Sequence, residues 1–136
     1  LNGKILGKPS SDKEATEMLL SLAGVQHTVV TGLTAMDISS GRVLSRCDTS
    51  QVMMRHYSDD EVAVYVASGA ALDKAGGYGI QDAEFSPVEF SNGCYLNIVG
   101  LSLCYVVDLM SSIGWRVQPR FDWQPATRCV NCPLTV

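Results

Sequence analysis

A run of β-branched residues, a tight turn and a second extended stretch together constrain the fold more than any other feature. From His27 to Ile38 the sequence is rich in valine and threonine, which favour strands. Ser39-Ser40-Gly41 supplies turn residues, and Arg42 to Met54 has the character of a returning strand. We therefore predict a long antiparallel β-hairpin.

Two helices with clear start signals flank this hairpin. Ser11-x-x-Glu14 and Ser58-x-x-Glu61 both have the spacing of a capping box, in which a hydroxyl and a carboxylate satisfy free N–H groups at a helix start. Apolar residues at helical spacing follow each signal. The expected buried faces are Ala15, Met18, Leu19 and Leu22 in the first helix, and Val62, Tyr65 and Val66 in the second.

The C-terminal half predicts one more strand and one more helix. Phe85 to Phe90 is expected to be an edge strand, because Pro87 cannot donate a ladder hydrogen bond. Leu101 to Ile113 is expected to be a helix that ends at Gly114. Its expected inward face is Leu103, Val106, Val107, Met110 and Ile113.

This order of elements indicates an α/β fold with a mixed, largely antiparallel sheet flanked by helices. Residues 1–114 are expected to form the domain, and residues 115–136 an irregular tail rich in proline, aromatic residues and cysteine.

Residues 72–81 hold the densest set of groups suited to binding. Gly76, Gly77 and Gly79 lie close together, and glycine allows a backbone to approach a ligand with its N–H groups as donors. Lys74 adds a positive point charge suited to phosphate, and Gln81 offers donors and an acceptor for the edge of a base. The segment is interpreted as a pocket for an anion and a heterocycle; the alternative is a glycine-rich surface turn.

Charge and cysteine content exclude several classes of protein. The net charge of −4 over 136 residues argues against binding along a nucleic-acid polymer, which needs clustered Lys and Arg. No apolar run approaches the ~20 residues of a membrane span. The five cysteines are odd in number and scattered, as in a reducing cytoplasm. Cys129-x-x-Cys132 could be half a zinc site or a redox pair, but two free thiols are the preferred interpretation.

The first six residues resemble the second half of a hairpin whose turn is Asn2-Gly3. Neither a preceding strand nor an initiator methionine is present. We therefore expect that an N-terminal portion is absent from this sequence.

Short motifs along the chain together resemble the Maf (septum formation protein) family, over residues 1 to about 114. They are Gly7-Lys8-Pro9 with its helix, His27-x-Val29-x-Thr31-Gly32, Asp73-Lys74-Ala75-Gly76-x-Tyr78-Gly79-Ile80-Gln81, and Asn97-x-Val99-Gly100-Leu101. Each is weak alone; their order and spacing carry the resemblance.

The resemblance implies a Maf/ITPase-like fold and a cytoplasmic nucleoside triphosphate pyrophosphatase. Such enzymes use a divalent metal (Mg²⁺ or Mn²⁺) to cleave between the α and β phosphates, giving a monophosphate and pyrophosphate. The 73–81 stretch is similar to the branch acting on dTTP and UTP, which implies a pyrimidine nucleotide. Lys8 and Lys74 are the implied catalytic residues. The expected substrate-binding residues are Asp73, Gly76, Gly77, Tyr78 and Gln81.

The chain also departs from the family pattern. A Ser-x-Ser-x-Arg-Arg loop and an Asp-Thr-Val-Val strand, whose aspartate is the family's presumed base and metal partner, are not found. Asp82 stands where glycine is usual, and it places a negative charge beside Gln81. Ser102 stands where proline is usual. Metal ligands are therefore not assigned.

Two functional hypotheses stay open. The first is a pyrophosphatase that is inactive or nearly so as this chain alone. The second is a non-catalytic module that binds a nucleotide or a partner protein and is linked to septum formation. Because the absent strand and helix would expose a sheet edge and apolar surface, a homodimer or a swapped assembly is expected.

Overall fold

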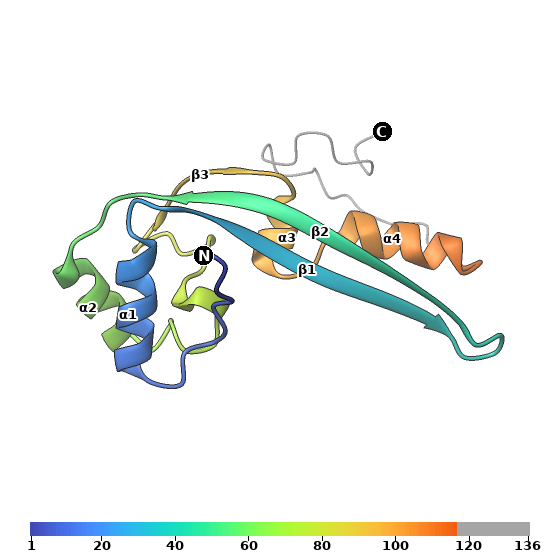
Figure 1. The fold of residues 1–136 in the computed structure, drawn as a ribbon, viewed down its shortest axis with the longest axis horizontal. Coiled ribbons are helices and arrows are strands. Elements are labelled where there is room, and N and C mark those ends of the chain that lie inside the picture. Colours follow the sequence, from blue (N-terminus) through green and yellow to red (C-terminus); the bar gives the residue numbers. More distant parts are fainter. Residues whose placement is uncertain (117–136) are drawn as a thin grey trace. The chain divides into compact units, whose positions relative to one another are not determined.

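The structure is a computed structural model and describes residues 1–116 of the 136-residue chain. The chain divides into two compact units (Figure 1). The first unit comprises Leu1–Thr28 and Gln51–Ser91. The second comprises Val29–Ser50 and, within the described residues, the chain from Asn92 onward.

The predicted hairpin is confirmed, and it forms most of a three-stranded antiparallel sheet. Strand β1 spans Gln26–Asp37, β2 spans Arg42–Met54 and β3 spans Val88–Asn92, in the order β1-β2-β3. At the hairpin tip the Asp37 carboxylate accepts hydrogen bonds from the Ser39 and Ser40 side chains and from the Ser39 N–H. These bonds, that of Ser40 above all, lower the pKa of Asp37 to about 2.

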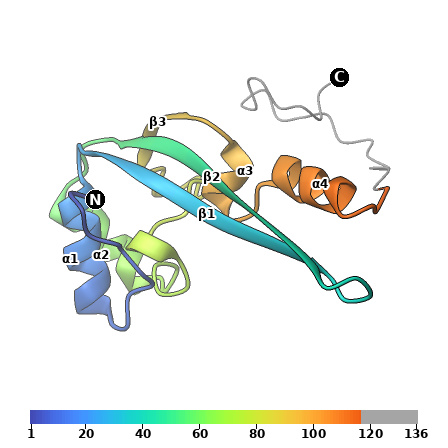
Figure 2. The same ribbon diagram turned by 45° about the vertical axis from the view of Figure 1, so that its right-hand side comes forward.

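Helices α1 (Asp12–Leu22) and α2 (Asp59–Ala67) pack side by side in the first unit (Figure 2). The predicted faces are confirmed: Ala15, Leu19 and Leu22 are buried in α1, with Met18 half-buried, and Val62, Tyr65 and Val66 are buried in α2.

The two predicted capping boxes differ. Ser58 and Glu61 form a complete box at α2. At α1, Ser11 accepts a hydrogen bond from the Glu14 N–H, but the Glu14 carboxylate is bound to the N–H and hydroxyl of Ser10 instead of returning to Ser11.

Strand β3 is an edge strand, as predicted, but its extent differs. Phe85 and Pro87 precede it and are buried. Phe85 stacks on Tyr65 with ring centroids 4.3 Å apart, and its ring centroid lies 5.0 Å from that of Tyr57. This segment therefore fills the core of the first unit, because an aromatic ring buries more apolar surface there than on an edge strand.

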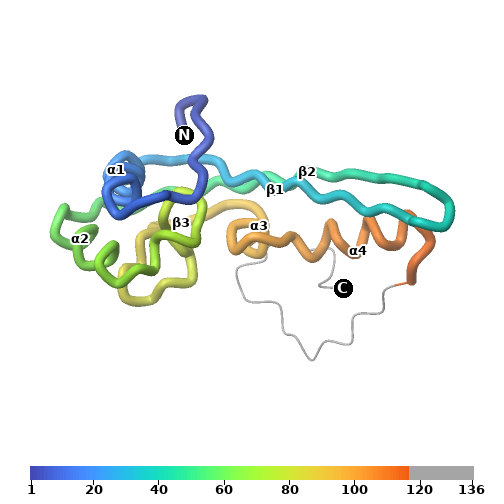
Figure 3. The backbone as a smooth tube through the Cα atoms, turned by 90° about the horizontal axis from the view of Figure 1, so that it is seen from below, coloured from blue at the N-terminus to red at the C-terminus, as the bar shows by residue number. Residues whose placement is uncertain are grey.

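The second unit contains two helices, α3 (Tyr95–Val99) and α4 (Leu103–Ser112). Helix α3 was not predicted from the sequence. Helix α4 runs along the outer half of the hairpin (Figure 3). Its most buried residue is Leu109, which is 2% exposed, whereas the five residues expected to point inward are only half-buried. The expected inward face omitted Leu109, but three of its members, Val106, Met110 and Ile113, line the groove between α4 and the hairpin.

The predicted Asn2-Gly3 turn is confirmed. Both residues have positive φ, 48° and 76°, as a two-residue hairpin turn requires. The Lys4 N–H donates to the Leu1 carbonyl at 2.8 Å, and the Leu1 amino group donates to the Lys4 carbonyl at 2.9 Å. No strand follows the turn before α1, and Ile5 is 98% exposed.

Within residues 1–116, none of the helices is long and apolar enough to cross a membrane. The predicted tail, with Trp123, Cys129 and Cys132, lies almost wholly outside the described residues, so its domain boundary stays a prediction.

Candidate functional site

The glycine segment folds as a short 3₁₀ turn, Ala75–Gly77, in the first unit. Gly76 and Gly77 have φ of 73° and 76°, a backbone conformation that costs other residues free energy. Both are buried, and their N–H groups donate to the carbonyls of Gly7 (2.9 Å) and Lys74 (3.0 Å). The expectation that these N–H groups are free for a ligand was therefore wrong.

The bond from Gly76 to Gly7 places the Gly7-Lys8-Pro9 segment against the same turn. Asp73 forms an ion pair with Lys74, one of the two candidate catalytic lysines. A hydrogen bond from Lys74 is the main cause of the lowered pKa of Asp73, and the charge of Lys8 contributes further. The structure thus places the segment that carries Lys8 beside the turn that follows Asp73 and Lys74, although the two are distant in the chain.

Lys74 is held in place by two acceptors. Its Nζ donates to Asp73 Oδ1 at 2.6 Å and to the Ala70 carbonyl at 2.7 Å. Its stem crosses Gly79, where a Cβ would lie only 3.0 Å from Lys74 Cε. The bond to Asp73 raises the pKa of Lys74, so the ammonium group stays charged at neutral pH.

The ion pair between Lys74 and Asp73 is open to solvent on its acidic side. The Asp73 side chain is 77% exposed, and such pairs contribute little to stability. An anionic ligand could therefore displace this carboxylate at small cost.

Tyr78 stabilises the turn through a buried contact with His27. It is 8% exposed, and its hydroxyl lies 2.8 Å from Nε2 of the equally buried His27, with the two rings edge to face. Burial raises the pKa of the Tyr78 hydroxyl and lowers that of His27. Tyr78 thereby anchors the turn to β1, and its contact with a substrate stays a prediction.

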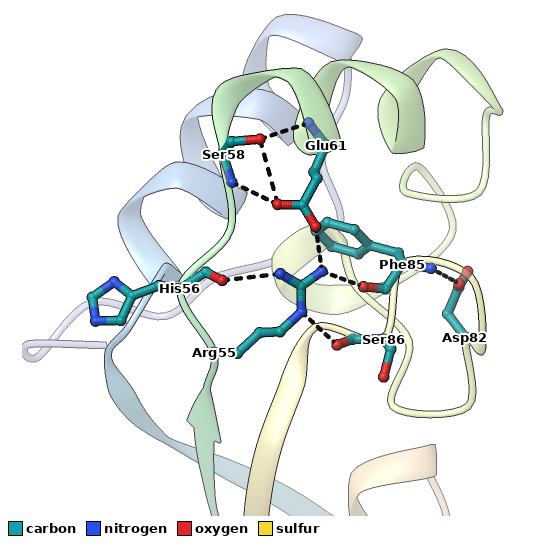
Figure 4. Close-up of polar contacts among 7 residues, drawn as sticks. All are labelled: Arg55, His56, Ser58, Glu61, Asp82, Phe85 and Ser86. Carbon is teal, nitrogen blue, oxygen red and sulfur yellow. Dashed lines mark hydrogen bonds and ion pairs between the residues drawn. The ribbon is translucent and has the colours of Figure 1, made fainter.

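Gln81 follows in an exposed position, and within the described residues its side chain forms no hydrogen bond. The neighbouring Asp82 is half-buried, and its Oδ1 accepts the Phe85 N–H at 2.9 Å (Figure 4). Its carboxylate therefore caps a turn within its own loop.

Arg55 is the residue of this region that sequence reasoning missed. It follows the last residue of β2 and donates to three carbonyls and to Glu61 (Figure 4). No local sequence signal marks it, because its partners near residue 85 are some thirty positions away.

The described residues do not fit a metal ion held by protein ligands alone. Among residues 1–116, no three His, Cys, Asp or Glu side chains gather closely enough to bind one. Asp73 is paired with Lys74, and Asp82 accepts a backbone N–H.

Asn97 has a structural role in the second unit. It is fully buried, and its Nδ2 donates to the Val29 carbonyl at 3.3 Å and to Ser50 Oγ at 2.9 Å. Ser102 is also fully buried, and its hydroxyl donates to Cys94 Sγ at 3.7 Å. The bonds of Asn97 fasten α3 to the hairpin, and the bond of Ser102 joins the starts of α3 and α4.

Comparison with known proteins agrees with the motifs. The family profile described as Maf-like protein matches residues 1–113. Over 130 residues the chain is 46% identical to a dTTP/UTP pyrophosphatase of Dehalococcoides mccartyi (strain ATCC BAA-2266 / KCTC 15142 / 195), covering 96% of this chain and 58% of the relative. A protein of the same name from Thermomicrobium roseum is 40% identical over 132 residues, covering 97% and 60% respectively. One from Geobacter sulfurreducens is 40% identical over 112 residues, covering 82% and 59%.

The chain therefore spans less than two thirds of the length of these curated relatives. The resemblance that the motifs indicated is confirmed.

Proposed function

Because this chain belongs to the Maf family, we propose that it forms part of a nucleoside triphosphate pyrophosphatase that acts on dTTP and UTP. The reaction would cleave the bond between the α and β phosphates and release a nucleoside monophosphate and pyrophosphate. The relatives' names support the substrate class. The observation that carries the proposal is that the segment with Lys8 is hydrogen-bonded to the turn that directly follows the Asp73–Lys74 ion pair and leads to Gln81.

The two lysines would supply positive charge to the phosphate oxygens. Phosphoryl chemistry depends mainly on positioning and on neutralising charge that develops in the transition state. Lys74 is charged and held by Asp73 and by the Ala70 carbonyl, so a polyphosphate that displaces Asp73 would meet an ammonium group already in place. Gln81, exposed at the end of the loop, would read the base.

We propose that the divalent metal implied by the family, Mg²⁺ or Mn²⁺, binds to this site only together with the nucleotide. These ions commonly bind through one or two carboxylates and substrate phosphates. Bound to the phosphates, the metal would neutralise part of their charge. We also propose that the protein is located in the cytoplasm.

A first test measures binding and turnover with the same protein. We expect the chain to bind dTTP and UTP more tightly than dATP in calorimetry with Mg²⁺. Lys74→Met should weaken dTTP binding about tenfold or more, because it removes a charge-assisted contact. Lys13→Met is the matched control, since Lys13 is an exposed α1 lysine paired only with Glu17. Equal affinities of the Lys74→Met variant and the unmodified chain for dTTP would contradict the site.

Release of pyrophosphate, assayed in parallel with dTTP, UTP and CTP, separates the two functional hypotheses. Turnover that Lys74→Met abolishes supports the enzyme. Selective binding without pyrophosphate release would support the nucleotide-binding module.

A further inference from the structure

We propose that Arg55 is a positioning residue that holds the loop of residues 78–86, which carries Gln81. By fixing Gln81, Arg55 would determine how the site distinguishes one nucleobase from another. This inference rests on the proposed function, because it concerns how the same site selects its substrate. It assigns a role to a residue that touches neither lysine of the site.

The guanidinium of Arg55 is bound on several sides (Figure 4). Nε donates to the Ser86 carbonyl at 2.9 Å, and Nη2 donates to the Phe85 carbonyl at 2.7 Å and to Glu61 Oε1 at 2.7 Å. Nη1 donates to the carbonyl of His56 at 2.9 Å. The Arg55 side chain is 30% exposed, so these bonds are partly shielded from water.

A short chain of hydrogen bonds leads from this clamp to Gln81. The Phe85 N–H donates to Asp82 Oδ1 at 2.9 Å, and the Ser86 N–H donates to the Asp82 carbonyl at 3.1 Å. The Asp82 N–H in turn donates to the Gly79 carbonyl at 3.1 Å, closing the turn that contains Gln81. The position of the Gln81 backbone therefore depends on Asp82, which depends on the segment that Arg55 holds.

Only arginine can make this set of contacts. Its planar group presents five N–H donors in a fixed fork, whereas lysine offers one ammonium on a flexible stem. The Arg55 guanidinium carbon also lies 5.6 Å from the Tyr57 ring centroid and 5.7 Å from that of Phe85. Glu61, which binds Arg55, completes the capping box of α2, so the loop is tied to the start of a helix.

The other end of the loop is anchored independently. His27 holds Tyr78 at 2.8 Å, three residues before Gln81. With that anchor intact, loss of the Arg55 contacts should loosen Gln81 while leaving Lys8 and Lys74 in place. This separation of base and phosphate contacts makes the inference testable.

The experiment measures the affinities of the full chain for dTTP and for tripolyphosphate, each with Mg²⁺. We expect Arg55→Lys to weaken dTTP binding about tenfold, since it removes hydrogen bonds from a charged group, and to leave tripolyphosphate binding unchanged. Gln81→Ala should have the same pattern, and the double variant should be no weaker than either single one. Arg46→Lys is the control, since Arg46 forms an exposed ion pair with Asp108.

A variant with an independent mechanism guards against failure of Arg55→Lys to fold. Asp82→Ala removes the acceptor for the Phe85 N–H, and it should also weaken dTTP binding selectively. Asp82→Asn keeps an oxygen acceptor at that position and should restore the affinity.

Two results would overturn the inference while leaving the proposed function intact. One is that the unmodified chain binds dTTP and Arg55→Lys binds it equally well. The other is that Arg55→Lys weakens dTTP and tripolyphosphate by the same factor, as a general structural role would. If the unmodified chain binds neither ligand, the proposed function itself fails, and the inference fails with it.

Discussion

At the scale of single residues, the burial of one imidazole links this protein's stability to pH. His27 is 8% exposed, and burial lowers its pKa below the ordinary value of 6.5. In the unfolded chain His27 would be protonated with the ordinary pKa. In the folded chain its protonation requires a lower pH, because burial disfavours the charged imidazolium. The unfolded state therefore binds more protons in this window, and the free energy of unfolding falls as the pH drops below about 6.5.

We expect urea denaturation to show a lower midpoint at pH 5.5 than at pH 7.5, with a smaller difference in His27→Gln. Glutamine keeps an amide near Tyr78 but does not titrate, so this part of the pH dependence disappears. His56→Gln, at an exposed histidine, should retain the wild-type difference. A His27→Gln variant that loses as much stability on acidification as the unmodified chain would contradict this account.

Residue identities also explain which parts of the site could be predicted. The two lysines and Gln81 carry charge or donors within recognisable motifs, so they were found. The Gly76 N–H donates to the carbonyl of Gly7, nearly seventy positions earlier, and no local sequence pattern reveals that hydrogen bond. The contacts of Arg55 with the carbonyls near residue 85 were missed for the same reason.

At the scale of elements, local rules were sufficient wherever an element is long or capped. The hairpin follows from β-branched residues around a serine-glycine turn, and α1 and α2 follow from their caps and apolar faces. Helix α3 has only five residues and turns Asn97 inward, so it shows no apolar periodicity. Phe85 was wrongly assigned to a strand. Its packing against Tyr65 depends on tertiary structure, so no local sequence pattern reveals it.

The complete capping box gives a prediction for α2. Ser58→Ala should lower the free energy of unfolding by about 1 kcal/mol, because the Glu61 N–H loses its side-chain acceptor. Ser91→Ala, at an exposed position of β3, should change it by less than about 0.5 kcal/mol. Chemical denaturation of both variants makes the comparison. Equal stabilities of the two would show that the cap contributes nothing.

At the scale of the whole molecule, the second unit presents two surfaces suited to association. Strand β1 is outermost in the sheet, and from Val29 to Met36 it has no charge and no proline to protect its edge. A groove of about 770 Å³ lies between the outer hairpin and α4, lined largely by apolar residues, among them Leu33, Met36 and Ile113. The homodimer is still a prediction. We expect its interface to form at one of these two surfaces.

Light scattering at micromolar concentration tests this expectation. The chain should associate, and Val30→Lys should shift it toward the monomer, because it places a charge on the β1 strand at a position 57% exposed. Val64→Lys, at a 74% exposed position on α2, should leave association unchanged. A monomeric unmodified chain would contradict the prediction.

The contacts of Arg55 with the loop have a consequence for how this protein can evolve. Arg55 grips the loop through the carbonyl oxygens of Phe85 and Ser86, which every amino acid possesses. Ala83 and Glu84 have exposed side chains, so these contacts do not restrict their identities. Substitutions at these two positions can therefore change the outer face of this loop, and with it the surroundings of Gln81, without removing any hydrogen bond from Arg55.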